Sequence, residues 1–182
     1  MRWMRLKVLP LVAVILLLFA MMAVLFGLTA VDDGWARKDD RTHFGWKGGE
    51  IKGKHYDEDD LRSTGWQRGG RAVLAGSVVV LLLLTWSLFF ACLRVFACGP
   101  LSISHVGWSV LCLTTLVWVI CWSTWAADTQ KDRERLHASP DWAFAFAIAG
   151  SVCTLAACVA LMMAPSYDYA VFEEDGYAVI GV

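Results

Sequence analysis

Four long stretches of the chain contain no Asp, Glu, Lys or Arg, and they constrain the fold more than any other feature. They are residues 8–31, 72–93, 95–127 and 142–167. An α-helix needs roughly 20 apolar residues to cross a hydrocarbon core about 30 Å thick. A soluble globule of 182 residues could not bury so much apolar surface. The sequence therefore predicts an integral membrane protein with four spans.

The third stretch is too long for one span, and Gly99 and Pro100 interrupt it. Because proline suits the first turn of a helix better than its interior, we expect the third helix to begin near Leu101. The predicted fold is an all-α four-helix transmembrane bundle, with residues 1–182 forming a single membrane domain. Its expected parts are spans at about 8–31, 72–93, 101–126 and 142–164, a large polar loop at 32–71, a short loop at 127–141 and a C-terminal tail at 165–182.

The polar loop 32–71 is densely charged yet neutral, with nine basic residues, nine acidic residues and eight glycines. Gly-Trp pairs recur in it at Gly34-Trp35, Gly45-Trp46 and Gly65-Trp66. One interpretation places these indoles at the membrane interface, with basic neighbours facing phosphates. The other is coincidence in a chain with ten Trp and fifteen Gly.

The orientation is predicted from the charges that flank the spans. Arg2, Arg5 and Lys7 crowd the first span and favour a cytosolic N-terminus, and an even number of spans then places the C-terminus in the cytosol as well. The nine Lys and Arg residues of the polar loop favour the opposite orientation. We expect a multi-pass protein of the plasma membrane or an endomembrane, with both termini cytosolic.

Residues that could carry chemistry are scarce. Among Asp, Glu, Lys, Arg and His, the predicted spans hold only His105, although an enzyme or ion-coupled transporter would keep ionisable groups there for function. His43 and His55 with the acidic run at 57–60 could hold a cation, but a solvated charge cluster is the more ordinary interpretation. The sequence therefore predicts no catalytic or metal site, no cofactor, no nucleic-acid partner and no enzymatic activity.

Two patterns predict traffic and modification. In the tail, Tyr169 precedes Phe172 and Tyr177 precedes Ile180 with the spacing of tyrosine-based sorting signals, which bind clathrin adaptors as extended peptides. Cysteines at a helix end are candidates for reversible palmitoylation, and buried structural thiols are the alternative. The candidates are Cys92 and Cys98.

Several short strings resemble the amastins, a family of four-span surface proteins of trypanosomatid parasites. The strings are Thr42-His43-Phe44-Gly45-Trp46-Lys47, Cys92-Leu93-Arg94-Val95, residues 112–118 and residues 142–165. Cysteines normally flank the family's loop signature, whereas Asp40 and Glu50 lie near those places here. The resemblance implies a claudin-like bundle whose first loop adds a few strands, a cytosolic N-terminus, and a role without a catalytic reaction.

Together these observations predict a non-enzymatic surface protein that acts in membrane organisation, adhesion or interaction through its first loop. Its partners would be membrane lipids and other membrane proteins or a second copy of itself. The residues expected to form the interaction surface, which could equally fold the loop, are Thr42, Phe44, Gly45, Trp46 and Lys47. The alternatives are a membrane-complex assembly factor and a small transporter or channel subunit, whose polar path would run along Ser77, Thr85, Ser87, Ser109, Thr114 and Thr115.

Overall fold

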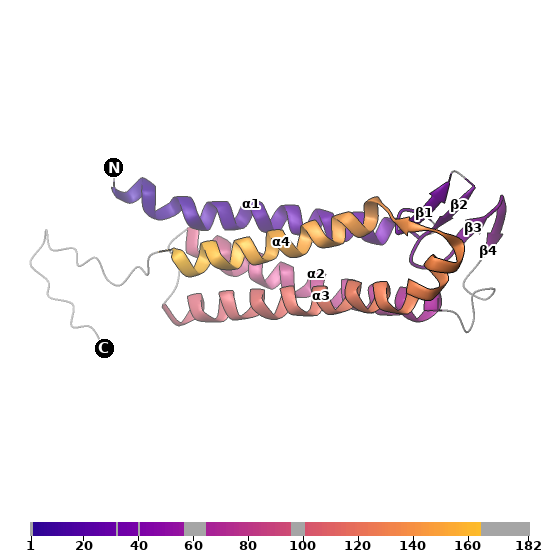
Figure 1. Cartoon of the computed structure of the whole chain (residues 1–182). Helices are drawn as coiled ribbons and strands as arrows, with labels where there is room; N and C mark the ends of the chain where they lie inside the picture. Colours follow the sequence, from indigo (N-terminus) through magenta and orange to yellow (C-terminus); the bar gives the residue numbers. More distant parts are fainter. Residues whose placement is uncertain (1, 32, 40, 57–64, 96–100, 165–182) are drawn as a thin grey trace, which may run out of the picture.

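The computed structural model describes residues 2–31, 33–39, 41–56, 65–95 and 101–164. Its four helices are α1 (Arg2–Thr29), α2 (Gly65–Val95), α3 (Leu101–Leu136) and α4 (Trp142–Met163). They form an elongated bundle, and a small sheet covers one of its ends (Figure 1). All four are long and apolar enough to cross a membrane, as the charge-free stretches predicted.

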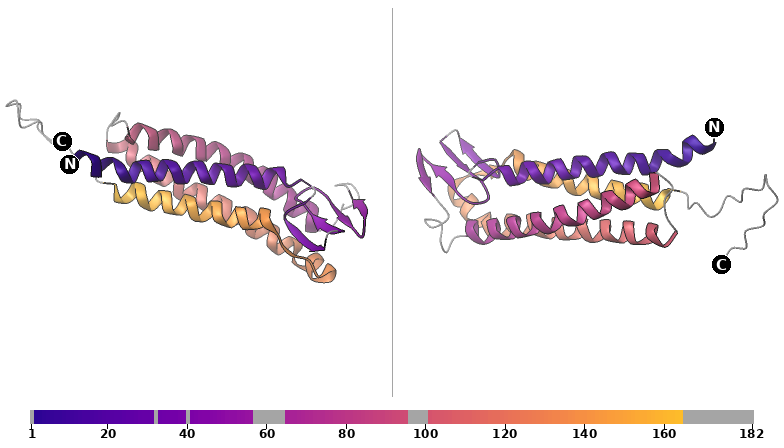
Figure 2. Two further views of the ribbon diagram at one scale, coloured as in Figure 1. Left: turned by 90° about the horizontal axis from the view of Figure 1, so that it is seen from above. Right: turned by 180° about the vertical axis from the view of Figure 1, so that it is seen from behind.

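The helices form a ring in which each packs mainly against two others. Helix α2 lies along α3 and helix α1 along α4, and these two pairs meet through α1 with α2 and α3 with α4. Figure 2 shows the same arrangement from above and from behind. The start of α1 and the end of α4 lie at the end of the bundle opposite to the sheet (Figure 1).

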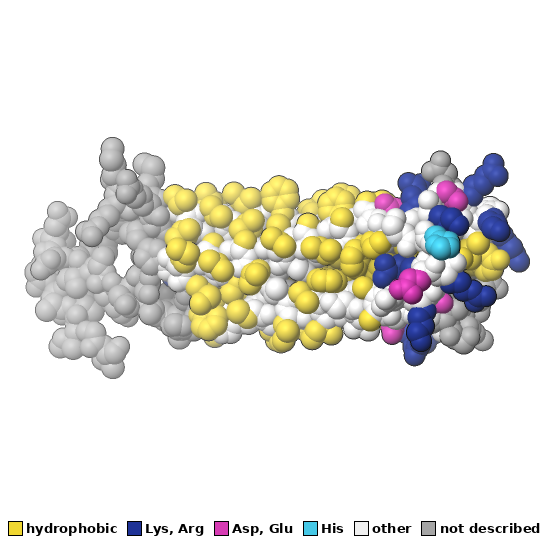
Figure 3. Space-filling model, viewed as in Figure 1, with side chains coloured by type: hydrophobic (Ala, Val, Ile, Leu, Met, Phe, Trp, Pro, Cys, Tyr) yellow, Lys and Arg dark blue, Asp and Glu magenta, His cyan; other side chains and the backbone are white. Residues whose placement is uncertain are grey.

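The bundle carries large apolar side chains on its surface, and its interior combines large side chains such as Leu17 and Trp118 with small ones. Phe19, Leu82 and Met163 are more than half exposed, and similar side chains cover the helical part of the molecule (Figure 3). In contrast, Ala143, Ala147 and Ser151 of α4, which are small and spaced four residues apart, are buried, so this helix turns a row of small residues toward its neighbours. This distribution suits a protein surrounded by lipid, where close backbone packing holds helices together.

Two helices extend beyond their predicted ends at the sheet side of the bundle. Helix α2 begins at Gly65 rather than near residue 72, because the Asp132 carboxylate of α3 accepts a 3.1 Å hydrogen bond from the Gly65 amide. Helix α3 continues to Leu136 rather than ending near residue 126. The charged segment that was expected to be a loop is helical because its side chains bond to each other one turn apart, as Gln130 does with Glu134 at 2.8 Å.

The polar loop contains a sheet, so the prediction of an all-α fold is wrong in this part. Its strands are β1 (Ala36–Asp39), β2 (Thr42–Phe44), β3 (Gly49–Ile51), β4 (Lys54–Tyr56) and β5 (Ser139–Pro140). The order is β4-β3-β2-β1-β5, and every neighbouring pair is antiparallel. Strand β5 comes from the connection between α3 and α4, so the sheet joins the two loops. The proline of β5 occupies an edge, where a missing N–H does no harm.

Candidate functional site: a sheet held on the helix ends

We call residues 33–39 and 41–56, together with β5, the cap. Its inner side rests on the helix ends through aromatic rings. Phe44 stacks on Trp66 of α2 with ring centroids 4.4 Å apart, and Trp35 lies 5.0 Å from Trp125 of α3. Trp66 and Trp125 also meet edge to face at 5.7 Å, and all four side chains are less than 5% exposed. The cap is thus attached by one continuous aromatic cluster, which we call the joint.

Two tryptophans of the cap, Trp35 of the joint and the nearby Trp46, also satisfy free backbone carbonyls at the end of α1. The indole N–H of Trp35 donates to Gly27 O at 3.1 Å, and that of Trp46 donates to Leu28 O at 2.9 Å. The two carbonyls on either side accept from the Thr29 hydroxyl and the Val31 amide. An unpaired carbonyl is costly near a hydrocarbon core, so these two tryptophans link the fold of the cap to the termination of the first span.

Glycines on α2 allow its first turns to approach the cap and α3 at backbone distance. A methyl group on Gly70 would overlap the carbonyl of Trp46, and one on Gly65 would overlap the carbonyl of Asp128. Gly69 lies against Trp125. The absence of side chains here therefore lets the cap, α2 and α3 meet closely.

Arg133 closes the joint from the α3 side. Its guanidinium lies 5.4 Å from the centroid of Trp125, donates to the Thr129 hydroxyl at 3.2 Å and donates to Ala126 O at 2.9 Å. A guanidinium over an indole face gains cation–π attraction while its hydrogen bonds are satisfied. This charge is consequently a packing element of the helix end.

The outer side of the cap is charged and, among the described residues, mostly basic, while the whole loop 32–71 carries equal numbers of acidic and basic residues. Figure 3 shows Lys and Arg side chains gathered at this end of the molecule. Within the described residues 33–56, the exposed carboxylate is that of Asp39. The exposed cations are six: Arg37, Lys38, Arg41, Lys47, Lys52 and Lys54. Most of them lie on or beside the strands, so the sheet holds them in a fixed arrangement.

The strand register brings His43, Glu50 and His55 into one row across β2, β3 and β4. Nδ1 of His43 is buried and has no hydrogen-bond partner among the residues that the structure describes. Even so, no group of three His, Cys, Asp or Glu side chains within the described part of the chain is arranged to hold a metal ion.

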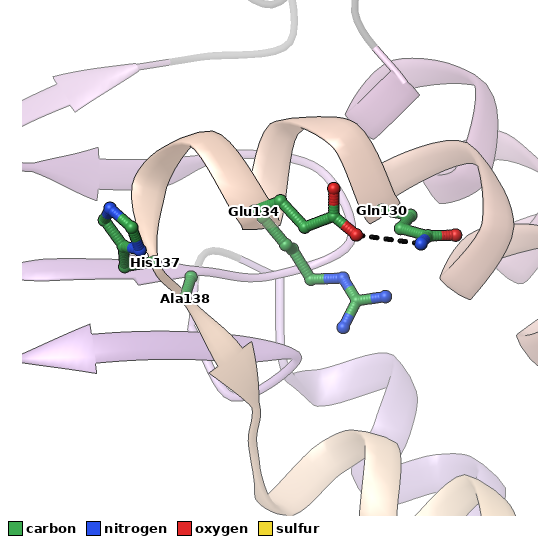
Figure 4. Close-up of a pocket in the computed structure, with 5 residues that line it drawn as sticks. Gln130, Glu134, His137 and Ala138 are labelled. Atoms are coloured by element: carbon green, nitrogen blue, oxygen red, sulfur yellow. Dashed lines mark hydrogen bonds between the residues drawn. The ribbon is translucent and has the colours of Figure 1, made fainter.

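A groove of about 570 Å³ lies beside the cap at the end of α3. Its lining residues are Gln130, Arg133, Glu134, His137 and Ala138 (Figure 4). Gln130 and Glu134 bond to each other and Arg133 bonds to its own helix, so the groups that a ligand would use are already paired. The groove therefore adds a polar surface beside the cap.

The residues predicted to form the interaction surface lie close together but mostly face inward. Thr42, Phe44 and Gly45 are buried, and Trp46 is half-buried in the joint. The side chain of Lys47 is exposed, while its amide donates to Val31 O at 3.0 Å. Of the basic outer residues, only Lys47 was singled out from the sequence, although the sequence does show the density of charge in the loop.

The structure describes only one of the remaining predicted sites. Cys92 is half-buried near the end of α2, and its palmitoylation stays a prediction. Cys98 lies outside the described residues, as do the sorting-signal residues Tyr169, Phe172, Tyr177 and Ile180.

Four of the six hydroxyls predicted to line a polar path are bonded within their own helices, whereas the buried hydroxyl of Ser77 has no partner among the described residues. Those of Thr85, Ser87, Thr114 and Thr115 donate to the carbonyl four residues earlier. Thr115 also meets Thr154 of α4 at 3.0 Å. These bonds satisfy the four hydroxyls without water.

Comparison with known proteins gives no relative: no family model matches the chain, and no curated protein matches it.

Proposed function

We propose that this protein is a non-enzymatic multi-pass membrane protein that presents a folded, basic cap to other molecules at a membrane surface. The observation that carries the proposal is the division of the cap into two sides. Its buried aromatic residues attach it to the helix ends. Its outer side carries exposed Lys and Arg side chains on or beside the strands of the sheet. Charged surfaces of this kind speed and select the encounter with partners of opposite charge.

The proposed partner is another membrane protein, bound through the outer charged residues of the strands and turns. The proposed location is the plasma membrane or an endomembrane, with both termini cytosolic and the cap on the opposite side. In this proposal the chain is a divergent amastin-like protein. The supporting features are the short strings around Thr42 and Trp118 and the presence of strands in the first loop, which the resemblance implied.

Lys38, Lys52 and Lys54 offer a direct test of the interaction, because all three are exposed and none belongs to the joint. We expect the triple change Lys38→Glu, Lys52→Glu and Lys54→Glu to reduce partner capture in proximity labelling from live cells by about tenfold. The matched control is Lys131→Glu, an exposed site on α3. Equal labelling by both variants, with both at normal abundance, would reject the cap as the recognition surface.

The orientation is tested separately with epitope tags inserted at Gly53 and after Val182. Gly53 lies in the exposed turn between β3 and β4, where an insertion leaves the joint intact. We expect antibodies to reach the Gly53 tag in intact cells and the Val182 tag only after permeabilisation. The reverse result would place the cap in the cytosol. Access to neither tag in intact cells would place the protein in an internal membrane.

A further inference from the structure

Two cysteines from neighbouring helices touch each other where α3 packs against α4. Sγ of Cys112 on α3 lies 3.3 Å from Sγ of Cys158 on α4. The thiol of Cys158 also lies 3.6 Å from the carbonyl of Trp108. The other cysteines that the structure describes, Cys92, Cys121 and Cys153, make no such contact within the described part of the chain. This pair therefore differs from thiols that simply fill space.

Polar contacts next to the pair, toward the sheet end of the bundle, hold α3 against α4. The hydroxyl oxygens of Thr115 and Thr154 lie 3.0 Å apart, about one turn away. Further along, the indole N–H of Trp118 donates to Ala147 O at 3.0 Å. A slip of one helix along the other would break these bonds. The two sulfur atoms are consequently held next to each other.

The separation of the sulfurs is small enough for a covalent bond. A disulfide joins its sulfurs at about 2.05 Å, with Cα atoms usually about 4.4–6.8 Å apart. Closing the gap requires the sulfurs to approach by somewhat more than about 1 Å, which rotation of two side chains can supply. Cys158 is buried, whereas Cys112 is exposed on the outer surface of the bundle, so one member of the pair is open to reagents dissolved in the surrounding lipid.

We propose that Cys112 and Cys158 are a modification site: organic peroxides in the membrane oxidise them to a disulfide that links α3 to α4. Sγ of Cys112 attacks the terminal oxygen of the peroxide, the O–O bond breaks, and a sulfenic acid and an alcohol form. Sγ of Cys158 then attacks the sulfenic sulfur, the S–O bond breaks, and water leaves with the thiol proton. Two thiols lose two electrons in total, and the peroxide gains them.

The test counts free thiols after treatment of the purified full chain in lipid nanodiscs with cumene hydroperoxide. After denaturation, a maleimide reagent of known mass labels the remaining thiols. The chain has six cysteines, and we expect labelling to fall from six to four, with recovery on reduction. In Cys153→Ser, the control from the same helix, labelling should fall from five to three. Cys112→Ser should stay at five, and Cys158→Ser should lose no more than one label, because its Cys112 can form a sulfenic acid but not the disulfide.

Other outcomes reject the proposal. If labelling of the Cys112→Ser variant still falls by two, the disulfide joins other cysteines. If the wild-type chain keeps six labelled thiols at a peroxide dose that oxidises a control dithiol in the same nanodiscs, the pair is not reactive. A loss that reduction does not reverse would show overoxidation to sulfinic acid. None of these results depends on the cap, so this inference and the proposed function fail independently.

Discussion

At the scale of single residues, Trp35 combines more roles than any other side chain of the joint. It is fully buried, packs on Trp125 and on Phe144, and donates its N–H to Gly27 O. Its ring therefore contributes packing, and its nitrogen satisfies a carbonyl that has no other partner along the helix. These two contributions can be separated by substitution.

We expect Trp35→Ala to lower the free energy of unfolding by about 3–5 kcal/mol, because it removes a large buried ring. Trp35→Phe keeps most of the ring but leaves the Gly27 carbonyl unpaired, at a cost of about 1–3 kcal/mol. Reversible denaturation in mixed micelles measures both. The control is Trp86→Ala, which removes a tryptophan that is 58% exposed and should cost less than Trp35→Ala. Equal losses at both tryptophans would contradict the joint as described.

His137 is a residue in an uncommon conformation at the end of α3. Its φ is +56°, its amide bonds to Glu134 O, and the next amide bonds to Arg133 O. This pair of bonds is a Schellman motif, whose left-handed position is usually occupied by glycine. We expect His137→Gly to raise the free energy of unfolding by about 0.5–1 kcal/mol in the same denaturation assay. Lys131→Gly, within the helix, should lower it by a similar amount. Destabilisation by His137→Gly would show that the imidazole makes a contribution of its own.

At the scale of elements, the hairpin of β3 and β4 depends on a two-residue turn. Lys52 has φ +53° and Gly53 has φ +82°, which is the pattern of a type I′ turn. Asparagine is the preferred first residue of such turns, so we expect Lys52→Asn to slow amide hydrogen exchange in β3 and β4 by about twofold to fivefold. Gly53→Ala should accelerate it. Unchanged exchange in both variants would mean that the hairpin is held by its neighbours alone.

The sequence predicted the spans better than it predicted their ends. Charge-free runs locate the helices because lipid excludes charge, but a helix that leaves the membrane needs no apolar residues to continue. The charged turns between Asp128 and Leu136 are helical through contacts among their own side chains. The residue pattern itself did not predict the strands, which only the family resemblance implied, because three or four residues such as those of Lys54–Tyr56 are too few to show alternation.

The sequence also did not predict that most of the loop residues expected to form the interaction surface are buried. Phe44 is buried because Trp66 stacks on it, and Trp46 is anchored because the α1 carbonyls need donors. Both contacts join residues from different elements, which a local pattern does not reveal. The same sequence feature, an aromatic residue in a polar loop, is compatible with a contact surface and with an anchor.

At the scale of the whole molecule, the cap and the bundle behave as one body only if their backbones can approach. Gly70 is where this approach is closest. We expect Gly70→Ala to speed hydrogen exchange throughout β1–β4 by about tenfold or more while leaving the centres of the four helices protected. Gly27→Ala is the matched control, since its added methyl would meet only Trp35 at an ordinary 3.7 Å. If both variants leave the sheet equally protected, the cap does not require this contact.

The pairing of β1 with β5 has a consequence for how the protein is made. Arg37 and Ser139 lie 102 positions apart in sequence, with two complete spans between them. During synthesis, the outer edge of β1 stays open until Ser139 has left the ribosome and the fourth span begins to insert. A chain stopped before that point would expose a row of unpaired amides and carbonyls, which chaperones recognise and which promotes aggregation. Completion of the sheet is therefore a late event in biogenesis. It can occur only after both halves of the protein have reached the membrane.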